Sequence, residues 1–122
     1  MHKQLTKNFN SKEFDSPDEI FSGLKMDFQF VMDLQRLRDL VNEPLKISSG
    51  YRTSSHNKKV KGAAKSAHLS GNAADIVVNN SALRYIIVMY ALKIGFHRIG
   101  IGKNFVHLDN SKKLPNSVIW LY

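Results

Sequence analysis

Apolar residues recur at helical spacing in one long stretch in the first half of the chain. From about Lys25 to Asn42 they stand three or four positions apart and polar residues fill the gaps, which predicts an amphipathic helix with one face in the core. The apolar positions are Phe28, Val31, Leu34, Leu37 and Val41, with Phe30 and Met32 alongside. Pro44 cannot continue a helix and marks the end of this one.

A second helix is predicted from about Ala82 to Lys93. Asn79-Asn80-Ser81 offers the side-chain oxygens that cap a helix start, and Gly95 suits the left-handed residue that closes a helix. By contrast, Thr53 to Ser66 is polar and basic without a clear period, so we expect a long surface loop there.

Alternating and β-branched segments predict short strands. They are Leu45 to Ser48, Ala73 to Val78, Arg98 to Gly102, Phe105 to Asp109 and Val118 to Tyr122. Lys103-Asn104 joins the third and fourth as a hairpin. The sequence therefore predicts an α+β fold in a single domain, residues 1–122, with a small, mostly antiparallel sheet packed against two main helices.

Composition limits the chemistry that the chain can use. It has no cysteine, which excludes disulfides, thiolate ligands and cysteine nucleophiles. Any metal must be held by histidine and carboxylate, a donor set that suits zinc. The longest apolar run, Tyr85 to Leu92, is far shorter than the roughly 20 residues that span a bilayer, and the N-terminus lacks a signal peptide's apolar region. We expect a monomer, made in the cytoplasm, without membrane insertion.

The formal net charge of +8 favours polyanionic partners. Lysines gather at positions 58, 59, 61 and 65 and again at 112 and 113. A solvated loop explains them as well as a functional patch does, and both nucleic acid and anionic bacterial wall polymer are possible partners. The lysines lack interleaved aromatic residues and match no nucleic-acid motif, so we do not expect specific nucleic-acid binding.

The segment SAHLSGNAADI, residues 66–76, places His68 and Asp75 on either side of a glycine turn. Gly71 permits the turn, and Ala73 and Ala74 let the backbone approach closely, so the two polar side chains can face each other. The small residues thus make room for a site.

His107 lies on another predicted strand, where alternate residues share a face with it. If that strand pairs with the one containing Asp75, the face carries two imidazoles and one carboxylate, which can bind zinc and leave a fourth position open for catalysis. Each element also has an ordinary explanation, as a structural histidine or a turn-forming aspartate. Arg52, at a strand end, could hold a substrate carboxylate by two hydrogen bonds or form a surface ion pair.

Together these residues resemble the zinc D-alanyl-D-alanine carboxypeptidases, relatives of the lysostaphin-type and hedgehog-type metal domains, in the compact version common in bacteriophages. The resemblance runs from about Leu5 to Tyr122. It is carried by SGYR at 49–52, the SxHxxGxAxD pattern from Ser66 to Asp75, GF at 95–96, IGIG at 99–102 and FVHLD at 105–109. It implies the hedgehog/D-Ala-D-Ala-peptidase fold, zinc on His68, Asp75 and His107, and substrate contacts from Arg52 and Ser66.

One position departs from this family. Better-described members carry an acidic general base three places before the last zinc histidine, where this chain has Asn104, whose amide cannot accept a proton near neutral pH. Asn104 is then a candidate substrate contact. Asp109 is the candidate base, although it could instead orient a zinc histidine. His56 and His97 are weaker candidates, expected in exposed loops.

The resemblance implies metal-assisted hydrolysis of peptide bonds in peptidoglycan stem peptides or cross-links, with Arg52 holding a terminal carboxylate or stabilising developing charge. Exopeptidase and endopeptidase action both remain open. The alternative is a catalytically weak or inactive zinc-bearing module that binds wall peptide. In either case the protein would act at the cell wall or periplasm, in wall lysis or remodelling, and would need a separate route to reach it.

Overall fold

A computed structural model describes all of residues 1–122 as a mixture of helices and strands. The short 3₁₀ helices are η1 (Ser11–Phe14), η2 (Ser22–Lys25) and η3 (Ala67–Ser70). The α-helices are α1 (Phe28–Val41), α2 (Ser54–Lys59) and α3 (Ser81–Ile94). The strands are β1 (Ile47–Ser49), β2 (Ala73–Val77), β3 (Arg98–Ile101), β4 (Phe105–Asp109) and β5 (Val118–Leu121). The predicted α+β class is confirmed.

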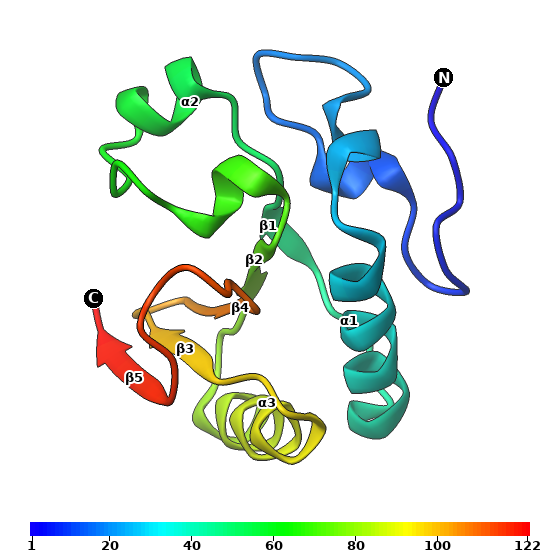
Figure 1. The fold of residues 1–122 in the computed structure, drawn as a ribbon. Coiled ribbons are helices and arrows are strands. Elements are labelled where there is room, and N and C mark those ends of the chain that lie inside the picture. Colours follow the sequence, from blue (N-terminus) through cyan, green and yellow to red (C-terminus); the bar gives the residue numbers. More distant parts are fainter.

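The five strands form one sheet in the order β1-β2-β4-β3-β5. All neighbours are antiparallel except β3 and β5, which run parallel, so the sheet is mostly antiparallel as predicted. Figure 1 shows α1 and α3 on one side of the sheet and α2 with η3 on the other. Because successive strand residues face opposite sides, one face of the sheet joins the core and the other can carry a site.

Helix α1 begins and ends at capping residues. The Asp27 carboxylate accepts a hydrogen bond from the Phe30 backbone N–H at 3.0 Å, and Asn42 closes the helix in the left-handed conformation. Phe30 is fully buried, whereas Phe28 is 58% exposed, so the prediction that Phe28 faces the core is wrong. Residues two apart on a helix point to nearly opposite sides, and therefore only one of this pair can be buried.

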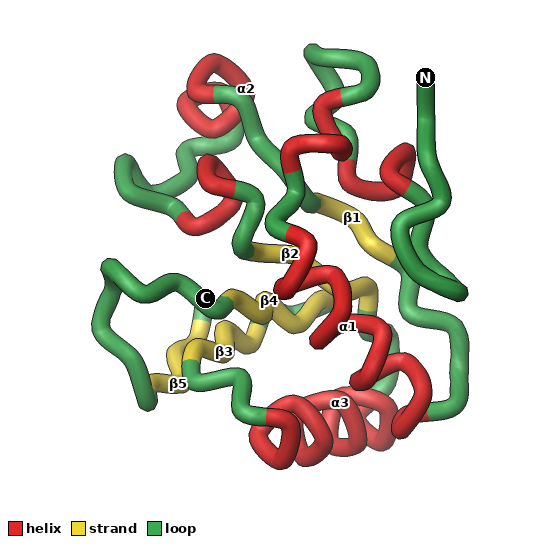
Figure 2. The backbone as a smooth tube through the Cα atoms, turned by 45° about the vertical axis from the view of Figure 1, so that its right-hand side comes forward, coloured by secondary structure: helices red, strands yellow, loops and turns green.

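Helix α3 is capped as the sequence predicts. The Asn80 side chain accepts from the Leu83 N–H at 2.7 Å, and Gly95, with φ of 110°, ends the helix. Figure 2 shows α3 beside α1 and next to the strands, where Ile87 and Ala91 are fully buried. No helix in the structure has both the length and the apolar character needed to cross a membrane.

The prediction of an irregular loop from Thr53 to Ser66 is wrong in its first half, which forms helix α2. Thr53 caps this helix by accepting from the His56 N–H at 3.1 Å. His56 is consequently half-buried in a helix rather than exposed in a loop, while His97 is exposed between α3 and β3 as expected. Six residues are too few to show a helical period in the sequence.

Candidate metal centre

Small residues let the segment before β2 pass close to its neighbours. Gly71 has φ of 75°, and a Cβ added there would come within 2.5 Å of the Lys25 carbonyl oxygen. Ala73 and Ala74 are fully buried. These contacts agree with the expectation that small side chains make room here, and the Asp27 N–H, which donates to the Gly71 carbonyl oxygen at 3.0 Å, holds the end of η3 against the segment before α1.

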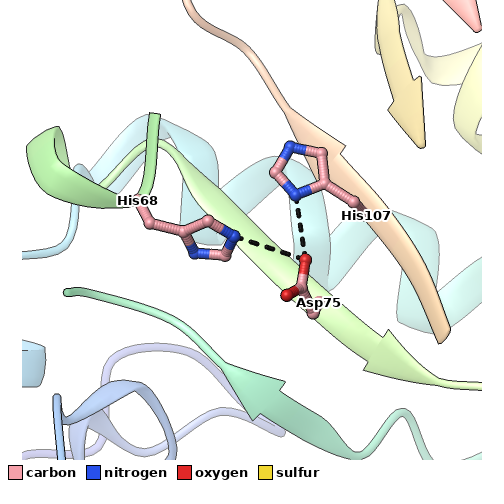
Figure 3. A group of neighbouring side chains, drawn as sticks. All are labelled: His68, Asp75 and His107. Atoms are coloured by element: carbon pink, nitrogen blue, oxygen red, sulfur yellow. Dashed lines mark hydrogen bonds and ion pairs between the residues drawn. The ribbon is translucent and has the colours of Figure 1, made fainter. Parts of the chain in front are cut away.

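The sheet register brings the two strand residues of the site face to face. Asp75 on β2 is the direct partner of His107 on β4. His68, in η3, approaches the same carboxylate from the side, as Figure 3 shows. One ligand atom from each side chain lies within 4.8 Å of the other two, and all three residues are buried. The structure therefore gathers the three residues that the sequence proposed as zinc ligands.

His68 is oriented by the backbone and presents a free ring nitrogen. Its Nδ1 donates to the Gly50 carbonyl oxygen at 2.7 Å. Its Nε2 lies 3.3 Å from Asp75 Oδ1 but is a buried nitrogen without a directed hydrogen bond. A buried nitrogen in this state needs a partner, and a metal ion between the three side chains would provide one. The donor set of two imidazoles and one carboxylate fits zinc.

His107 is held between two carboxylates. Its Nδ1 lies 2.9 Å from Asp75 Oδ1 and its Nε2 lies 2.7 Å from Asp109 Oδ2. The other oxygen of Asp109 accepts from Arg98 Nε at 2.8 Å and from the Ser111 N–H at 3.1 Å. Asp109 is 1% exposed and both its oxygens are occupied. Of the two roles that the sequence left open for Asp109, this geometry suits orienting His107 better than accepting a proton from water.

The charges of the cluster stabilise one another. Burial alone raises the pKa of Asp75, but the hydrogen bond from His107 and the nearby His68 ring outweigh it and hold this pKa well below its usual range. Burial lowers the pKa of His107, but its bonds to Asp109 and Asp75 outweigh burial and raise this pKa. Without metal, the hydrogen bonds between His107 and the two carboxylates thus help to stabilise their charge. A divalent cation would take over that role.

Arg52 bonds the carboxylate oxygen of Asp75 that the two histidines leave free. Its Nη2 donates to Asp75 Oδ2 at 3.3 Å, its Nε to Ser49 Oγ at 3.1 Å and its Nη1 to Asn57 Oδ1 at 3.3 Å. Asn57 is buried and also donates to the Ala63 carbonyl oxygen at 2.9 Å, so it ties the arginine to the segment after α2. The sequence gives no sign of this role, because a lone asparagine in a polar stretch belongs to no motif.

The cluster opens onto a cavity of about 500 Å³. One side, here called the polar wall, comprises Arg52, Lys61 and Ser66. Another, here called the aromatic wall, comprises Phe105, Trp120 and Tyr122. The aromatic wall was not anticipated, although Trp120 and Tyr122 stand two apart in a strand and therefore share a face.

The predicted substrate contacts divide between the cavity and the surface. Arg52 and Ser66 line the cavity, and Ser66 Oγ also accepts from the His68 N–H at 3.2 Å. Asn104 is exposed in the turn between β3 and β4 and is not among the lining residues. Its backbone oxygen accepts from the Val78 N–H at 2.9 Å. Position 104 thus contributes to the turn rather than to the cavity.

A mixed sheet with a His-Asp-His cluster in a cavity beside an arginine defines the protein as a small α+β domain with a candidate metal-binding site. A family model described as Peptidase M15 matches residues 4–109, and the chain belongs to this family of zinc peptidases of the D-Ala-D-Ala carboxypeptidase kind. No curated protein matches the chain. The family resemblance is confirmed, and the three candidate ligands fall inside the matched region.

Proposed function

We propose that the protein is a zinc-dependent peptidase that hydrolyses peptide bonds in peptidoglycan stem peptides or their cross-links. The observation that carries the proposal is the buried triangle of His68, Asp75 and His107, with an unpartnered ring nitrogen, open to a cavity next to Arg52. Three protein ligands leave a coordination position for water or substrate, which is the arrangement of catalytic rather than structural zinc.

Each side chain around the triangle has a distinct task in this proposal. Bound zinc would supply Lewis-acid activation of water and of the scissile carbonyl. Asp109 keeps the His107 ring in place through Nε2 and leaves Nδ1 for the metal. Arg52, preset by Ser49 and Asn57, would bind the terminal carboxylate of an exopeptidase substrate or the charge that develops on a cleaved carbonyl. Ser66 would bind substrate backbone.

Digestion of purified peptidoglycan tests the proposal. Zinc-loaded protein should release peptide fragments that mass spectrometry identifies, and loss of a terminal D-alanine would indicate carboxypeptidase action whereas cut cross-links would indicate endopeptidase action. Chelation and His68→Ala should both abolish release, because each removes the metal. A His68→Ala variant that retains zinc and full activity would overturn the ligand assignment.

A second candidate function is a zinc-bearing module that binds wall peptide without cutting it. The observation in its favour is the absence of a free carboxylate from the cavity. Asp75 and Asp109 are the only carboxylates that line it, one a candidate ligand and the other fully hydrogen-bonded. Peptide binding by the zinc-loaded protein, without any product in the digestion, would favour this function over hydrolysis.

We also propose that the protein acts at the cell wall. The net charge of +8 would hold it on anionic wall polymers. Co-sedimentation with insoluble peptidoglycan, with and without its anionic polymers, tests this. Retention should fall when the polymers are removed or salt is added. Equal retention on both preparations would contradict the role of charge.

A further inference from the structure

One row of side chains crosses four strands of the sheet at the metal centre. Asp75 pairs with His107, His107 with Gly100, and Gly100 with Trp120. Directly paired residues point to the same face of a sheet. Trp120 on β5 therefore lies on the same face as the candidate zinc ligands, separated from His107 only by a glycine.

Gly100 has no side chain, and the rings of Trp120 and Tyr122 occupy the space that one would fill. A Cβ at this position would come within 2.6 Å of the Tyr122 ring and 2.8 Å of the Trp120 ring. Because the glycine leaves this space free, Trp120 approaches His107 with 5.4 Å between ring centroids, and Tyr122 approaches it at 6.5 Å. The two rings therefore border the metal centre directly.

Other contacts fix the aromatic wall on its outer side. Arg98, which bonds Asp109, lies over the Trp120 ring at 4.9 Å, and Phe105 meets the Tyr122 ring at 4.9 Å. Tyr122 nevertheless remains 68% exposed. An exposed aromatic ring held beside a metal centre offers an apolar surface to a bound molecule.

The cavity carries charged side chains as well as the aromatic wall. The polar wall carries the cations Arg52 and Lys61, while Trp120 and Tyr122 fall outside the family match of residues 4–109. A peptide whose terminal carboxylate binds Arg52 and whose scissile carbonyl lies at the metal centre would have the residue before the cleaved bond beside that centre, which Trp120 and Tyr122 border.

We propose that Trp120 and Tyr122 form a subsite for the side chain of the residue whose carbonyl is cleaved, and that this subsite selects an alkyl side chain over glycine. The inference rests on the proposed function and names the part of the substrate that β5 recognises. The preference of the wild type for alanine over glycine should be about three- to fivefold, the value expected for burying one methyl group.

The chain supplies its own reporter, because Trp120 is its single tryptophan. The probes are N-acetyl-L-lysyl-D-alanyl-D-alanine and the same peptide with glycine as the middle residue. Each is mixed with zinc-loaded protein in a stopped-flow instrument, and Trp120 fluorescence gives Kd before turnover. The wild type should bind the alanyl peptide more tightly by the factor above.

Variants at position 122 separate the aromatic ring from its hydroxyl. Tyr122→Ala should bind both peptides equally, whereas Tyr122→Phe should keep the preference. The matched control is Leu121→Ala, on the same strand but facing away, where the side chain is 81% exposed. It should keep the preference as well. Both positions are exposed, so these variants should fold.

The outcomes distinguish the subsite from the function on which it rests. If the preference survives Tyr122→Ala, or the wild type has none, the subsite is overturned while the proposed function stands. If the wild type binds neither peptide, the proposed substrate is wrong and the subsite is overturned with it.

Discussion

Replacement of Asp109 by asparagine separates the two roles that this residue could have. The amide keeps the shape of the side chain but removes its negative charge. In the structure, Asp109 supports His107 through a 2.7 Å bond to Nε2 and is itself held by Arg98. We therefore expect Asp109→Asn to weaken zinc binding. At saturating zinc, the variant should keep much of the wild-type rate of hydrolysis.

The structure also indicates the size of this effect. Loss of a carboxylate that supports a metal-binding histidine costs roughly 10- to 100-fold in metal affinity, about 1.4 to 2.7 kcal/mol. The upper part of this range is expected here, because Asp109 is only 1% exposed and the bond that its carboxylate makes to His107 is charge-assisted. The variant also leaves the partly buried Arg98 guanidinium without its anion.

Competition with a chromophoric chelator measures the zinc affinity, and peptide hydrolysis at saturating zinc measures catalysis. Asp39→Asn is the matched control, since it makes the same charge change at an exposed site on α1 and should alter neither quantity. An Asp109→Asn protein with normal zinc affinity and no hydrolysis would refute the reasoning, and would make Asp109 the general base instead.

Four further predictions concern pH, Arg52 and the turn. Zinc affinity should rise as pH rises through the raised pKa of His107, because the metal displaces the proton from this ring. Calorimetry in two buffers should detect the released proton. A zinc affinity that does not change over this pH range would contradict the prediction. In the metal-free protein the same raised pKa stabilises the fold below the ordinary histidine value of about 6.5, and this contribution should be lost as pH rises through the folded-state pKa, which thermal melting can follow. Asn57→Ala frees Arg52 Nη1 and should raise KM several-fold at unchanged zinc affinity, and an unchanged KM would mean that Arg52 needs no such support. Asn104→Glu should leave kcat within about twofold, since position 104 does not line the cavity; a large gain would show that an acidic residue there reaches the metal after all.

Local patterns in the sequence were enough to predict the main helices and the strands, whereas the candidate ligands also depended on an assumed strand pairing and on the family resemblance. Capping signals at Asn80 and Gly95 and the stripe of α1 depend on residues close together in the chain, which is why they can be read without coordinates. The short helix α2 and the burial of Phe30 instead of Phe28 were missed. Helix α2 has only six residues, too few to show a helical period. Phe28 and Phe30 are both apolar, but only one of them can lie on the buried face of α1.

The sequence by itself determined which chemistry the chain can perform, because only histidine and carboxylate can hold a metal in a chain without cysteine. Tertiary structure decided which of those groups meet and what each does. The pairing of Asp75 with His107 is a matter of strand register, and the occupation of both Asp109 oxygens depends on Arg98 arriving from another strand. The aromatic wall likewise exists only because β5 pairs with β3 beside Gly100. Such contacts join residues far apart in the chain, and no local pattern of side chains specifies them.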